Sequence, residues 1–229
     1  MANDNNGDNA MGRLKLYGFW RSTATWRVRI ALEYKGIVYD YEPIDLSQGV
    51  EKQHSEEYRA KNPMRQVPLL EIDEIDGPAG GLRIAQSLAI IEYLEERFPE
   101  PRLLPEDPVL RARARQLAEM TNSGIQPLQN TSVQGFVREE LKADEKAWTR
   151  YWVSRGLAAL EVVTTETAGR FSIGDSISLP DILLVPELNF ARRFSIPLDP
   201  YPTLTRIEAA CADLPAFARA HADRQPDAQ

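Results

Sequence analysis

Residues 20–32 read Trp20-Arg-Ser-Thr-Ala-Thr-Trp-Arg-Val-Arg-Ile-Ala-Leu32 and follow a short apolar strand pattern at Leu14–Gly18. Small hydroxyl residues precede a predicted helix, whose apolar side chains recur with helical spacing over 26–34. A helix N-terminus exposes unpaired backbone N–H groups and a partial positive charge, so it stabilises an anion. If that anion is a thiolate, its thiol becomes a nucleophile at neutral pH. This stretch contains no cysteine, so the thiol would have to arrive on a small molecule.

The remainder of the first hundred residues alternates between strand and helix patterns. Apolar alternation predicts strands at 39–44, 67–72 and 82–84, with a glycine- and proline-rich turn at 74–81. An amphipathic helix is predicted over 87–98. The following segment, 98–108, holds four prolines in eleven residues, so it cannot continue the helix and is predicted to be a linker.

Only helical patterns follow the linker. They run roughly over 108–123, 125–141, 144–167, 179–194 and 203–221. Pro127 and Pro186 fall inside two of them and predict a helix start or a kink. Ser178 and Asp181 have the spacing of a capping box, with Pro180 in the first turn of the helix.

An α/β half followed by an all-α half favours a thioredoxin-like N-terminal domain and a C-terminal helical bundle domain. The predicted divisions are a disordered tail at 1–12, a thioredoxin-like domain at 13–98, a linker at 99–107 and a helical domain at 108–229.

Four blocks of sequence resemble the cytosolic glutathione S-transferases, and within them the zeta class. The resemblance covers residues 13 to about 225. The blocks are Arg21-Ser-Thr-Ala-Thr-Trp-Arg-Val-Arg-Ile-Ala-Leu32, Asn62-Pro-Met-Arg-Gln-Val-Pro68, Gln86-Ser-Leu-Ala-Ile-Ile-Glu-Tyr-Leu94 and Gly124-Ile-Gln-Pro-Leu-Gln-Asn130. As a set, in this order and at this spacing, they are highly specific.

The resemblance implies the glutathione transferase fold, a homodimer and glutathione as cofactor. It also implies cis–trans isomerisation of maleylacetoacetate to fumarylacetoacetate in tyrosine and phenylalanine catabolism. The expected chemistry is addition of glutathione's thiolate to the cis double bond, rotation, and elimination. Residues carried over to the glutathione site are Ser22, Thr23, Ala24, Thr25, Trp26, Arg27, Gln53, Gln66, Val67, Pro68, Gln86, Ser87, Gln126, Asn130, Thr131 and Ser132. Among these, Ser22 is expected to hold the sulfur, with Thr23 beside it.

Two of the blocks also have a physical interpretation of their own. In the family Pro68 follows a cis peptide bond, and Val67 would pair its backbone with the cysteinyl unit of glutathione as a short added strand. Without the other blocks, Val67 and Pro68 would indicate only an ordinary strand start. Ser87 is a natural N-cap, and the N–H groups after Gln86 could bind the γ-glutamyl carboxylate.

Most arginines are solvated surface groups, so an arginine is assigned to a site only where its position on the helix favours it. Arg27 and Arg29 lie two apart on one helix and face different ways, so at most one should point into a site, and we choose Arg27. The resemblance marks Arg193 as a clamp for a substrate carboxylate, with the neighbouring Arg192 as the surface alternative. A fork-shaped, permanently charged donor suits a carboxylate-bearing electrophile. The expected catalytic set is therefore Ser22, Thr23, Arg27 and Arg193.

One departure bears on the activity. The family pattern is Ser-Ser-Cys, whereas this chain has Ser22-Thr23-Ala24. Ala24 removes a thiol beside the substrate, which favours an alternative: a glutathione conjugase or dehalogenase acting on α-halo acids. A non-catalytic glutathione-binding module is a further alternative. A thioredoxin-type disulfide reductase is excluded because the chain has no Cys-x-x-Cys pair.

Composition limits the partners. A net charge of −7 argues against nucleic acid or an anionic membrane surface as the main partner. No run of apolar residues is long enough to span a membrane, and residues 1–12 lack the features of a targeting segment, so a cytoplasmic location is expected. The single cysteine, Cys211, is predicted to be a buried core residue. His54 and His221 lack metal-ligand spacing, so no metal is expected.

Overall fold

The structure of this chain is a computed structural model that describes residues 13–47, 49–73 and 81–229. The predicted tail at 1–12 and residues 74–80 of the turn predicted at 74–81 lie outside the described residues. The described residues form two compact units: residues 13–96 with 220–229, and residues 97–219.

The first unit is built on a four-stranded mixed sheet with strand order β2-β1-β3-β4. Strand β1 pairs in parallel with β2 and antiparallel with β3, and β3 pairs antiparallel with β4. Together with two long helices this confirms the predicted thioredoxin-like layer. The elements are β1 (Leu14–Gly18), α1 (Thr23–Tyr34), β2 (Asp40–Pro43), β3 (Leu69–Ile72), β4 (Leu82–Ala85) and α3 (Ser87–Arg97).

The register sorts the strand side chains onto two faces. Leu16, Leu70 and Ile84 are aligned across the sheet, and α1 packs on their face. The contact is close at Gly18, because a Cβ there would lie 2.3 Å from Cγ2 of Thr25. The sheet therefore brings the end of β1 directly against the first turn of α1.

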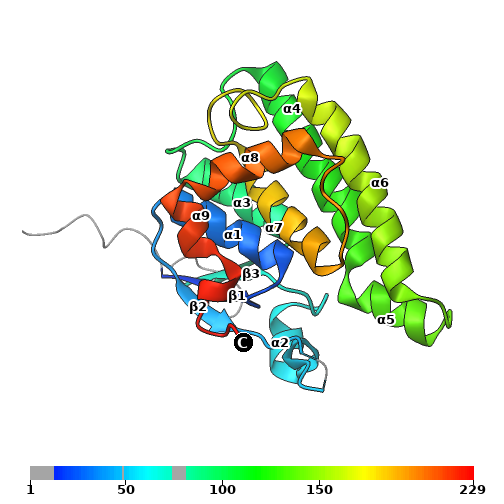
Figure 1. Cartoon of the computed structure of the whole chain (residues 1–229). Coiled ribbons are helices and arrows are strands. Elements are labelled where there is room, and N and C mark those ends of the chain that lie inside the picture. The colour runs from blue at the N-terminus through cyan, green and yellow to red at the C-terminus, as the bar shows by residue number, and fades with distance from the viewer. Residues whose placement is uncertain (1–12, 48, 74–80) are drawn as a thin grey trace, which may run out of the picture. The chain divides into compact units, whose positions relative to one another are not determined.

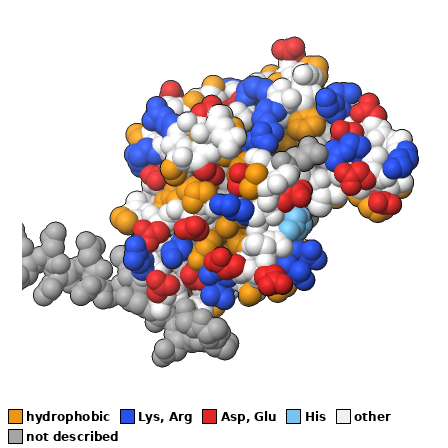
Figure 2. Space-filling view, turned by 90° about the horizontal axis from the view of Figure 1, so that it is seen from below, with side chains coloured by type: hydrophobic (Ala, Val, Ile, Leu, Met, Phe, Trp, Pro, Cys, Tyr) orange, Lys and Arg blue, Asp and Glu red, His pale blue; other side chains and the backbone are white. Residues whose placement is uncertain are grey.

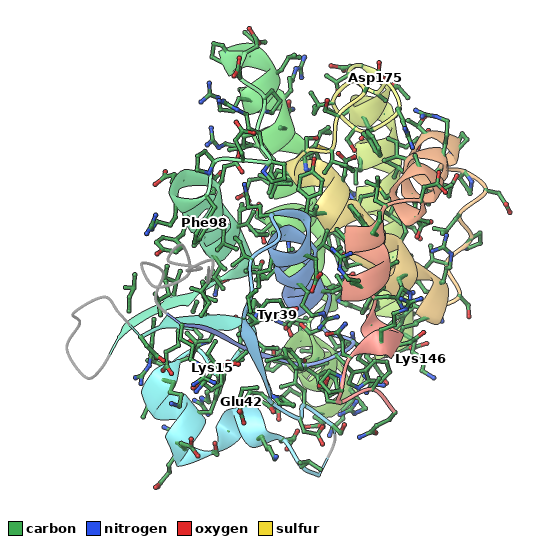
Figure 3. The ribbon with its side chains drawn as sticks, turned by 90° about the vertical axis from the view of Figure 1, so that its left-hand side faces the viewer. Lys15, Tyr39, Glu42, Phe98, Lys146 and Asp175 are labelled. Carbon is green, nitrogen blue, oxygen red and sulfur yellow. The ribbon has the colours of Figure 1, made fainter. Side chains whose placement is uncertain are left out.

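The opposite face carries a cluster of charged and aromatic side chains. Glu71 accepts hydrogen bonds from the Tyr17 hydroxyl at 3.0 Å and from Arg83 Nε at 2.7 Å. Lys61 Nζ lies 3.8 Å from the same carboxylate. Figure 3 shows that Lys15 and Glu42 also lie on the side of the strands where α2 (Glu56–Lys61) lies.

Two short helices between β2 and β3 were not predicted. They are the 3₁₀ helix η2 (Lys52–His54) and α2, which begins after the N-cap Ser55. Only Tyr58 of α2 is buried, so a six-residue helix gives too little apolar periodicity for a sequence pattern to reveal it.

The second unit is helical throughout its regular elements, as predicted, and α6 runs alongside α4 (Figure 1). Its elements are α4 (Pro108–Glu119), the π-helix η3 (Met120–Ile125), the 3₁₀ helix η4 (Gln126–Gln129), α5 (Thr131–Glu139), α6 (Glu145–Thr165), α7 (Leu179–Arg193), α8 (Pro202–Ala212) and α9 (Pro215–Ala220).

Two of the helices expected from the sequence are interrupted. The helix expected at 125–141 is split into η4 and α5, with Pro127 in the first turn of η4. The helix expected at 203–221 is split into α8 and α9, because Pro215 disfavours the helical conformation of Leu214. Pro186 lies inside α7 without ending it.

The capping box before α7 forms as predicted. Asp181 accepts hydrogen bonds from the Ser178 backbone N–H at 2.8 Å and from the Ser178 hydroxyl at 2.9 Å. It also accepts one from the Ser172 backbone N–H at 2.8 Å. Burial raises the pKa of the Asp181 carboxyl against the effect of these donors. Cys211 is buried, as predicted, and burial raises the pKa of its thiol.

The last ten residues differ from the expected division. We expected a helical domain running to residue 229, but 220–229 belong to the first unit. The reason is a set of hydrogen bonds between this segment and α1, β2 and the turn after β1. Residues 99–107, expected as a linker, lie in the second unit, where the Leu103 carbonyl accepts from the Leu179 N–H at 2.7 Å.

Candidate functional site

Three segments of the first unit meet at one end of the sheet. The register places Tyr17 opposite Leu69, and Leu69 opposite Ala85. The turn after β1, the loop before β3 and the turn after β4 therefore leave the sheet at the same end. One apolar cluster also joins them, since it contains Phe19, Val67 and Leu69 with Trp20 and Ala85 packed against it.

The turn after β1 presents Ser22 as the N-cap of α1. The Ser22 hydroxyl accepts a hydrogen bond from the Thr25 N–H at 3.2 Å. The Ser22 N–H donates to the Phe19 carbonyl at 3.0 Å, which closes the turn. Ser22 is partly exposed, whereas the helix behind it is buried. Its hydroxyl proton can therefore be given to a second acceptor while its oxygen caps the helix.

The start of α1 is suited to an anion. The first turn holds no acidic side chain. Among the described residues, no acceptor is bound to the backbone N–H groups of Thr23 and Ala24. Exposed N–H groups and the helix dipole at this end favour a negative charge, and a carboxylate does not already occupy the turn.

The loop before β3 contains a cis peptide bond between Val67 and Pro68, as the family resemblance implied. The carbonyl of Gln66 accepts from the Tyr58 hydroxyl and from Asn62 Nδ2, both at 2.7 Å. Within the described part of the chain, the Val67 N–H and C=O have no hydrogen-bond partner. The loop is thus held through Gln66 while the next residue keeps its backbone groups available for an added strand.

The turn after β4 leads into α3. Gln86 is exposed and has a left-handed backbone conformation, with φ of 73°. Its carbonyl accepts from the Ile90 N–H at 3.0 Å, so Gln86 occupies the cap position and Ser87 is the first residue of the helix. Our expectation that Ser87 is the N-cap was therefore wrong by one residue, because Gln86 adopts the turn conformation. The first turn of α3 contains no acidic side chain.

Gln53 lies on η2, between β2 and α2. Its Oε1 atom is buried and has no hydrogen-bond partner among the described residues. A buried amide oxygen without a partner costs free energy, so it indicates a hydrogen-bond donor that a ligand supplies to Oε1.

The remaining residues carried over on α1 point largely into the first unit. Thr25 is buried against Gly18, and Trp26 packs edge-on against the ring of His221 at 4.8 Å between centroids. Arg27 is only 2% exposed. Their contact with glutathione stays a prediction.

Arg29 proves to be a fully buried group, and sequence reasoning gave it no role. Its guanidinium donates to the carbonyl oxygens of Ala220 at 3.2 Å, Phe19 at 3.5 Å and Trp20 at 2.7 Å. Burial lowers the pKa of Arg29, and the neighbouring charge of Asp227 opposes that shift.

The second unit carries the other predicted residues. Gln126 lies on η4, Asn130 stands at the N-cap position of α5, and Thr131 and Ser132 are exposed in its first turn. The neighbouring Gln129 is buried and donates to Glu187 at 2.8 Å, a contact 58 residues apart that no local pattern reveals.

Two adjacent arginines at the end of α7 have different surroundings. Arg192 forms a two-pronged ion pair with Glu208 of α8. The Arg193 guanidinium lies over the Phe190 ring, 5.8 Å from its centroid, and the residue is exposed. The guanidinium of Arg192 is thus bound to Glu208 of α8, as expected for the arginine that was not assigned to the substrate carboxylate.

Neither a metal cluster nor a membrane helix is found in the described ranges. No group of three or more His, Cys, Asp or Glu side chains there could hold a metal ion. Likewise, no helix in the described part is long and apolar enough to cross a membrane. Figure 2 shows basic and acidic side chains interspersed on one face of the molecule, without one dominant basic field.

Residues 16–102 match the family model for the glutathione S-transferase N-terminal domain. The chain is 46% identical to the maleylacetoacetate isomerase of Rattus norvegicus over 94% of this chain and 95% of that protein. It is also similar to the solved structure of maleylacetoacetate isomerase from Anaeromyxobacter dehalogenans 2CP-1 with bound GSH in the active site. That likeness has a TM-score of 0.87 and 50% identity, and covers 96% of this chain and 99% of the other.

A second solved structure, holo maleyl pyruvate isomerase, is described as a bacterial glutathione S-transferase in the zeta class. It has a TM-score of 0.85 and 40% identity, and the match covers 94% of this chain and all of the other.

Proposed function

The chain belongs to the zeta class of the glutathione S-transferases, and on that premise we propose that it is a glutathione-dependent cis–trans isomerase converting maleylacetoacetate to fumarylacetoacetate. The observation that carries the proposal is the sequence identity to isomerases over nearly the full length. The Ser22 cap at a helix start free of acidic side chains supports it, because this is the feature that a thiolate needs.

The residues of the first unit fit glutathione. Its γ-glutamyl carboxylate would lie on the N–H groups at the start of α3, after Gln86. Its cysteinyl backbone would pair with Val67, whose N–H and C=O have no partner in the described part of the chain. Its glycyl unit would reach Gln53, where the glycyl N–H could donate to the buried Oε1, which has no partner among the described residues.

Further contacts follow from the resemblance and belong to the same proposal. They involve Thr23, Ala24, Thr25, Trp26, Arg27, Gln66, Pro68 and Ser87 of the first unit, and Gln126, Asn130, Thr131 and Ser132 of the second.

When bound, glutathione supplies the thiolate that adds to the cis double bond and leaves again after rotation, so it is regenerated. Ser22 donates its hydroxyl hydrogen to the sulfur, and the N-terminus of α1 favours the negative charge. Lowering a thiol pKa by about two units corresponds to roughly 2.7 kcal/mol of thiolate stabilisation, a modest demand for one hydroxyl and one helix end.

The substrate is a carboxylate-bearing electrophile, and we assign its carboxylate to Arg193. The guanidinium offers a fork of donors with a fixed positive charge. Arg27, buried on α1, is proposed to favour negative charge developing on the substrate's carbonyl oxygen.

Ala24 favours a second candidate function, glutathione-dependent dehalogenation of α-halo acids. The residue stands in the first turn of α1, where the family places a cysteine. Because the nucleophile is the sulfur of glutathione, the missing thiol need not abolish isomerisation. A non-catalytic glutathione-binding module is less well supported, since binding alone does not require Arg193.

A comparison of turnover rates on different substrates distinguishes these functions. Turnover of maleylacetone (a stable substrate mimic), maleylpyruvate and chlorofluoroacetate should be measured with the same protein and the same glutathione concentration. Isomerisation faster than halide release supports the proposal. Faster halide release supports the dehalogenase. Tight glutathione binding without turnover supports the binding module.

We further propose a homodimer in the cytoplasm. The support is the resemblance to transferases that usually pair. Sedimentation of the purified protein tests the assembly, and a mass near twice 25.9 kDa is the expected result.

A further inference from the structure

The turn that presents Ser22 is held by hydrogen bonds to both backbone polar groups of one residue, Trp20. The Trp20 N–H donates to Asp227 Oδ2 at 3.0 Å. The Trp20 carbonyl accepts from Arg29 Nη2 at 2.7 Å. Both backbone polar groups of Trp20 are therefore bound to side chains from other parts of the first unit.

Asp227 belongs to the C-terminal segment 220–229, which lies beside β2 in Figure 1. The same Oδ2 atom of Asp227 accepts from the Tyr41 hydroxyl of β2 at 3.2 Å. The other end of the segment is held by Arg29, whose Nε donates to the Ala220 carbonyl at 3.2 Å. The ring of His221 packs against Trp26 of α1. The segment is thus attached to α1, to β2 and to the turn before Ser22.

The link from this segment to the site is short. Trp20 lies two residues before Ser22, and the turn is closed by the Ser22 N–H on the Phe19 carbonyl at 3.0 Å. Arg29 also reaches that carbonyl, at 3.5 Å. Loss of the hydrogen bond between the Trp20 N–H and Asp227 would allow the turn to shift relative to α1. Shifts of about 1 Å in a reacting geometry can reduce rates by a factor of about 100.

We propose that Asp227 is a positioning residue for the thiolate site, acting through the Trp20 backbone to fix Ser22 at the start of α1. The inference rests on the proposed function, because it concerns the group that holds the sulfur of glutathione. No step of the reaction uses Asp227 itself. Its effect is geometric, because a carboxylate placed near a thiolate would by charge alone disfavour that thiolate.

Three variants test this role: Asp227→Ala, Asp227→Asn and Asp223→Ala. Asp223 is the matched control, since it is an exposed aspartate in the same segment whose contacts are with His221. The readouts are the pKa of the bound glutathione thiol, from thiolate absorbance against pH, and separate kcat and KM values for maleylacetone.

Asp227→Ala is expected to raise the thiol pKa by about 0.5 to 1 unit and to lower kcat at pH 7 by roughly three- to tenfold. Asp227→Asn should restore most of both values, because its amide oxygen can still accept from the Trp20 N–H. Asp223→Ala should match the wild type. A merely structural role would lower the unfolding midpoint and leave the thiol pKa in place.

The inference is overturned if Asp227→Ala keeps a thiol pKa within about 0.3 unit, and a kcat within about twofold, of the values of Asp223→Ala, whatever happens to its stability. Should Asp227→Ala fail to fold, Tyr41→Phe gives a second test, because it removes one donor to Oδ2. A smaller pKa rise in Tyr41→Phe supports the role, and a thiol pKa in Tyr41→Phe equal to that of the wild type contradicts it. A wild-type protein that leaves bound glutathione protonated at neutral pH would instead overturn the proposed function, and this inference with it.

Discussion

The Tyr58 hydroxyl donates to the Gln66 carbonyl at 2.7 Å, and this bond holds the loop whose next residue, Val67, has no hydrogen-bond partner for its N–H and C=O in the described part of the chain. Tyr58 is the one buried residue of α2, so the helix reaches the site through this side chain. Burial raises the pKa of Tyr58 to about 12, which keeps the phenol a donor across the physiological range.

Tyr58→Phe should therefore weaken glutathione binding several-fold with little change in kcat. The Asn62 amide still holds Gln66, so the loss of stability should be about 1 kcal/mol. Calorimetric titration with glutathione and urea unfolding measure the two effects. Tyr151→Phe, at an exposed tyrosine of α6, is the control that should change neither. Unchanged glutathione affinity in Tyr58→Phe would remove Tyr58 from the site.

Ser22→Ala should raise the pKa of the bound thiol by about one unit or more and lower the rate at neutral pH in proportion. Ser22→Thr should recover part of the effect. Thiolate absorbance against pH is the measurement. Ser55→Ala is a matched control, because Ser55 caps α2 with the same kind of bond, from the Tyr58 N–H at 3.2 Å. Each alanine should cost about 1 kcal/mol of stability, but only the change at Ser22 should move the thiol pKa. Equal thiol pKa values in both variants would contradict the assignment.

Arg193→Ala should raise KM for maleylacetone about tenfold or more, since a charge-assisted hydrogen bond contributes about 1.5–3 kcal/mol. Glutathione affinity should stay at the wild-type value. Steady-state kinetics with saturating glutathione, together with a glutathione titration, measure both. Arg192→Ala is the control: its ion pair with Glu208 lies at the surface, so the change should alter stability by no more than about 1 kcal/mol and leave KM unaffected. The same rise in KM in both variants would count against Arg193 as the carboxylate clamp.

Protonation of Glu71 is expected to account for part of the loss of stability of the fold in acid. Burial alone would raise the pKa of its carboxyl, but hydrogen bonds from Arg83 and Tyr17 and the charges of Lys61 and Arg83 outweigh burial and lower it. The unfolded chain then binds the proton more readily than the folded chain. The stability that Glu71 contributes is therefore present above the ordinary glutamate pKa of about 4.3 and is lost as pH falls through the lowered value.

Glu71→Gln should accordingly lose about 1–3 kcal/mol at neutral pH and show a flatter decline of stability below about pH 4.5. Urea unfolding at a series of pH values measures this slope. Glu42→Gln, at an exposed residue of β2, a strand that pairs with β1 and not with β3, is the control and should keep the wild-type slope. An unchanged acid slope in Glu71→Gln would show that the cluster does not link protonation to folding.

Local patterns predicted those parts of the molecule that local contacts determine. Strand β1 has the expected bounds, and the capping box of Ser178 and Asp181 joins residues three apart. Ser22 stands at the start of α1, as predicted. This position was predictable because a hydroxyl residue before a periodic apolar run is a local signal for a helix start. The N-cap of α3 was predicted one residue too late, at Ser87 instead of Gln86, since the left-handed backbone of Gln86 depends on the turn after β4.

The rest depends on contacts between distant residues. Asp227 and Trp20 are 207 residues apart, and Arg29 and Ala220 are 191 apart. An arginine in an amphipathic helix gives no local sign that it will be buried against backbone carbonyls. The assignment of 220–229 to the first unit could not be predicted from composition for the same reason.

In the proposed isomerisation, glutathione acts as a catalyst and is not consumed. The most direct measurement is a proton NMR time course of maleylacetone with this protein and a small amount of glutathione. We expect each glutathione molecule to support conversion of many cis molecules to the trans compound, with free glutathione unchanged at the end and no conversion without it. Conversion that stops when glutathione is consumed as an adduct, or no conversion by a protein that binds glutathione, would contradict it.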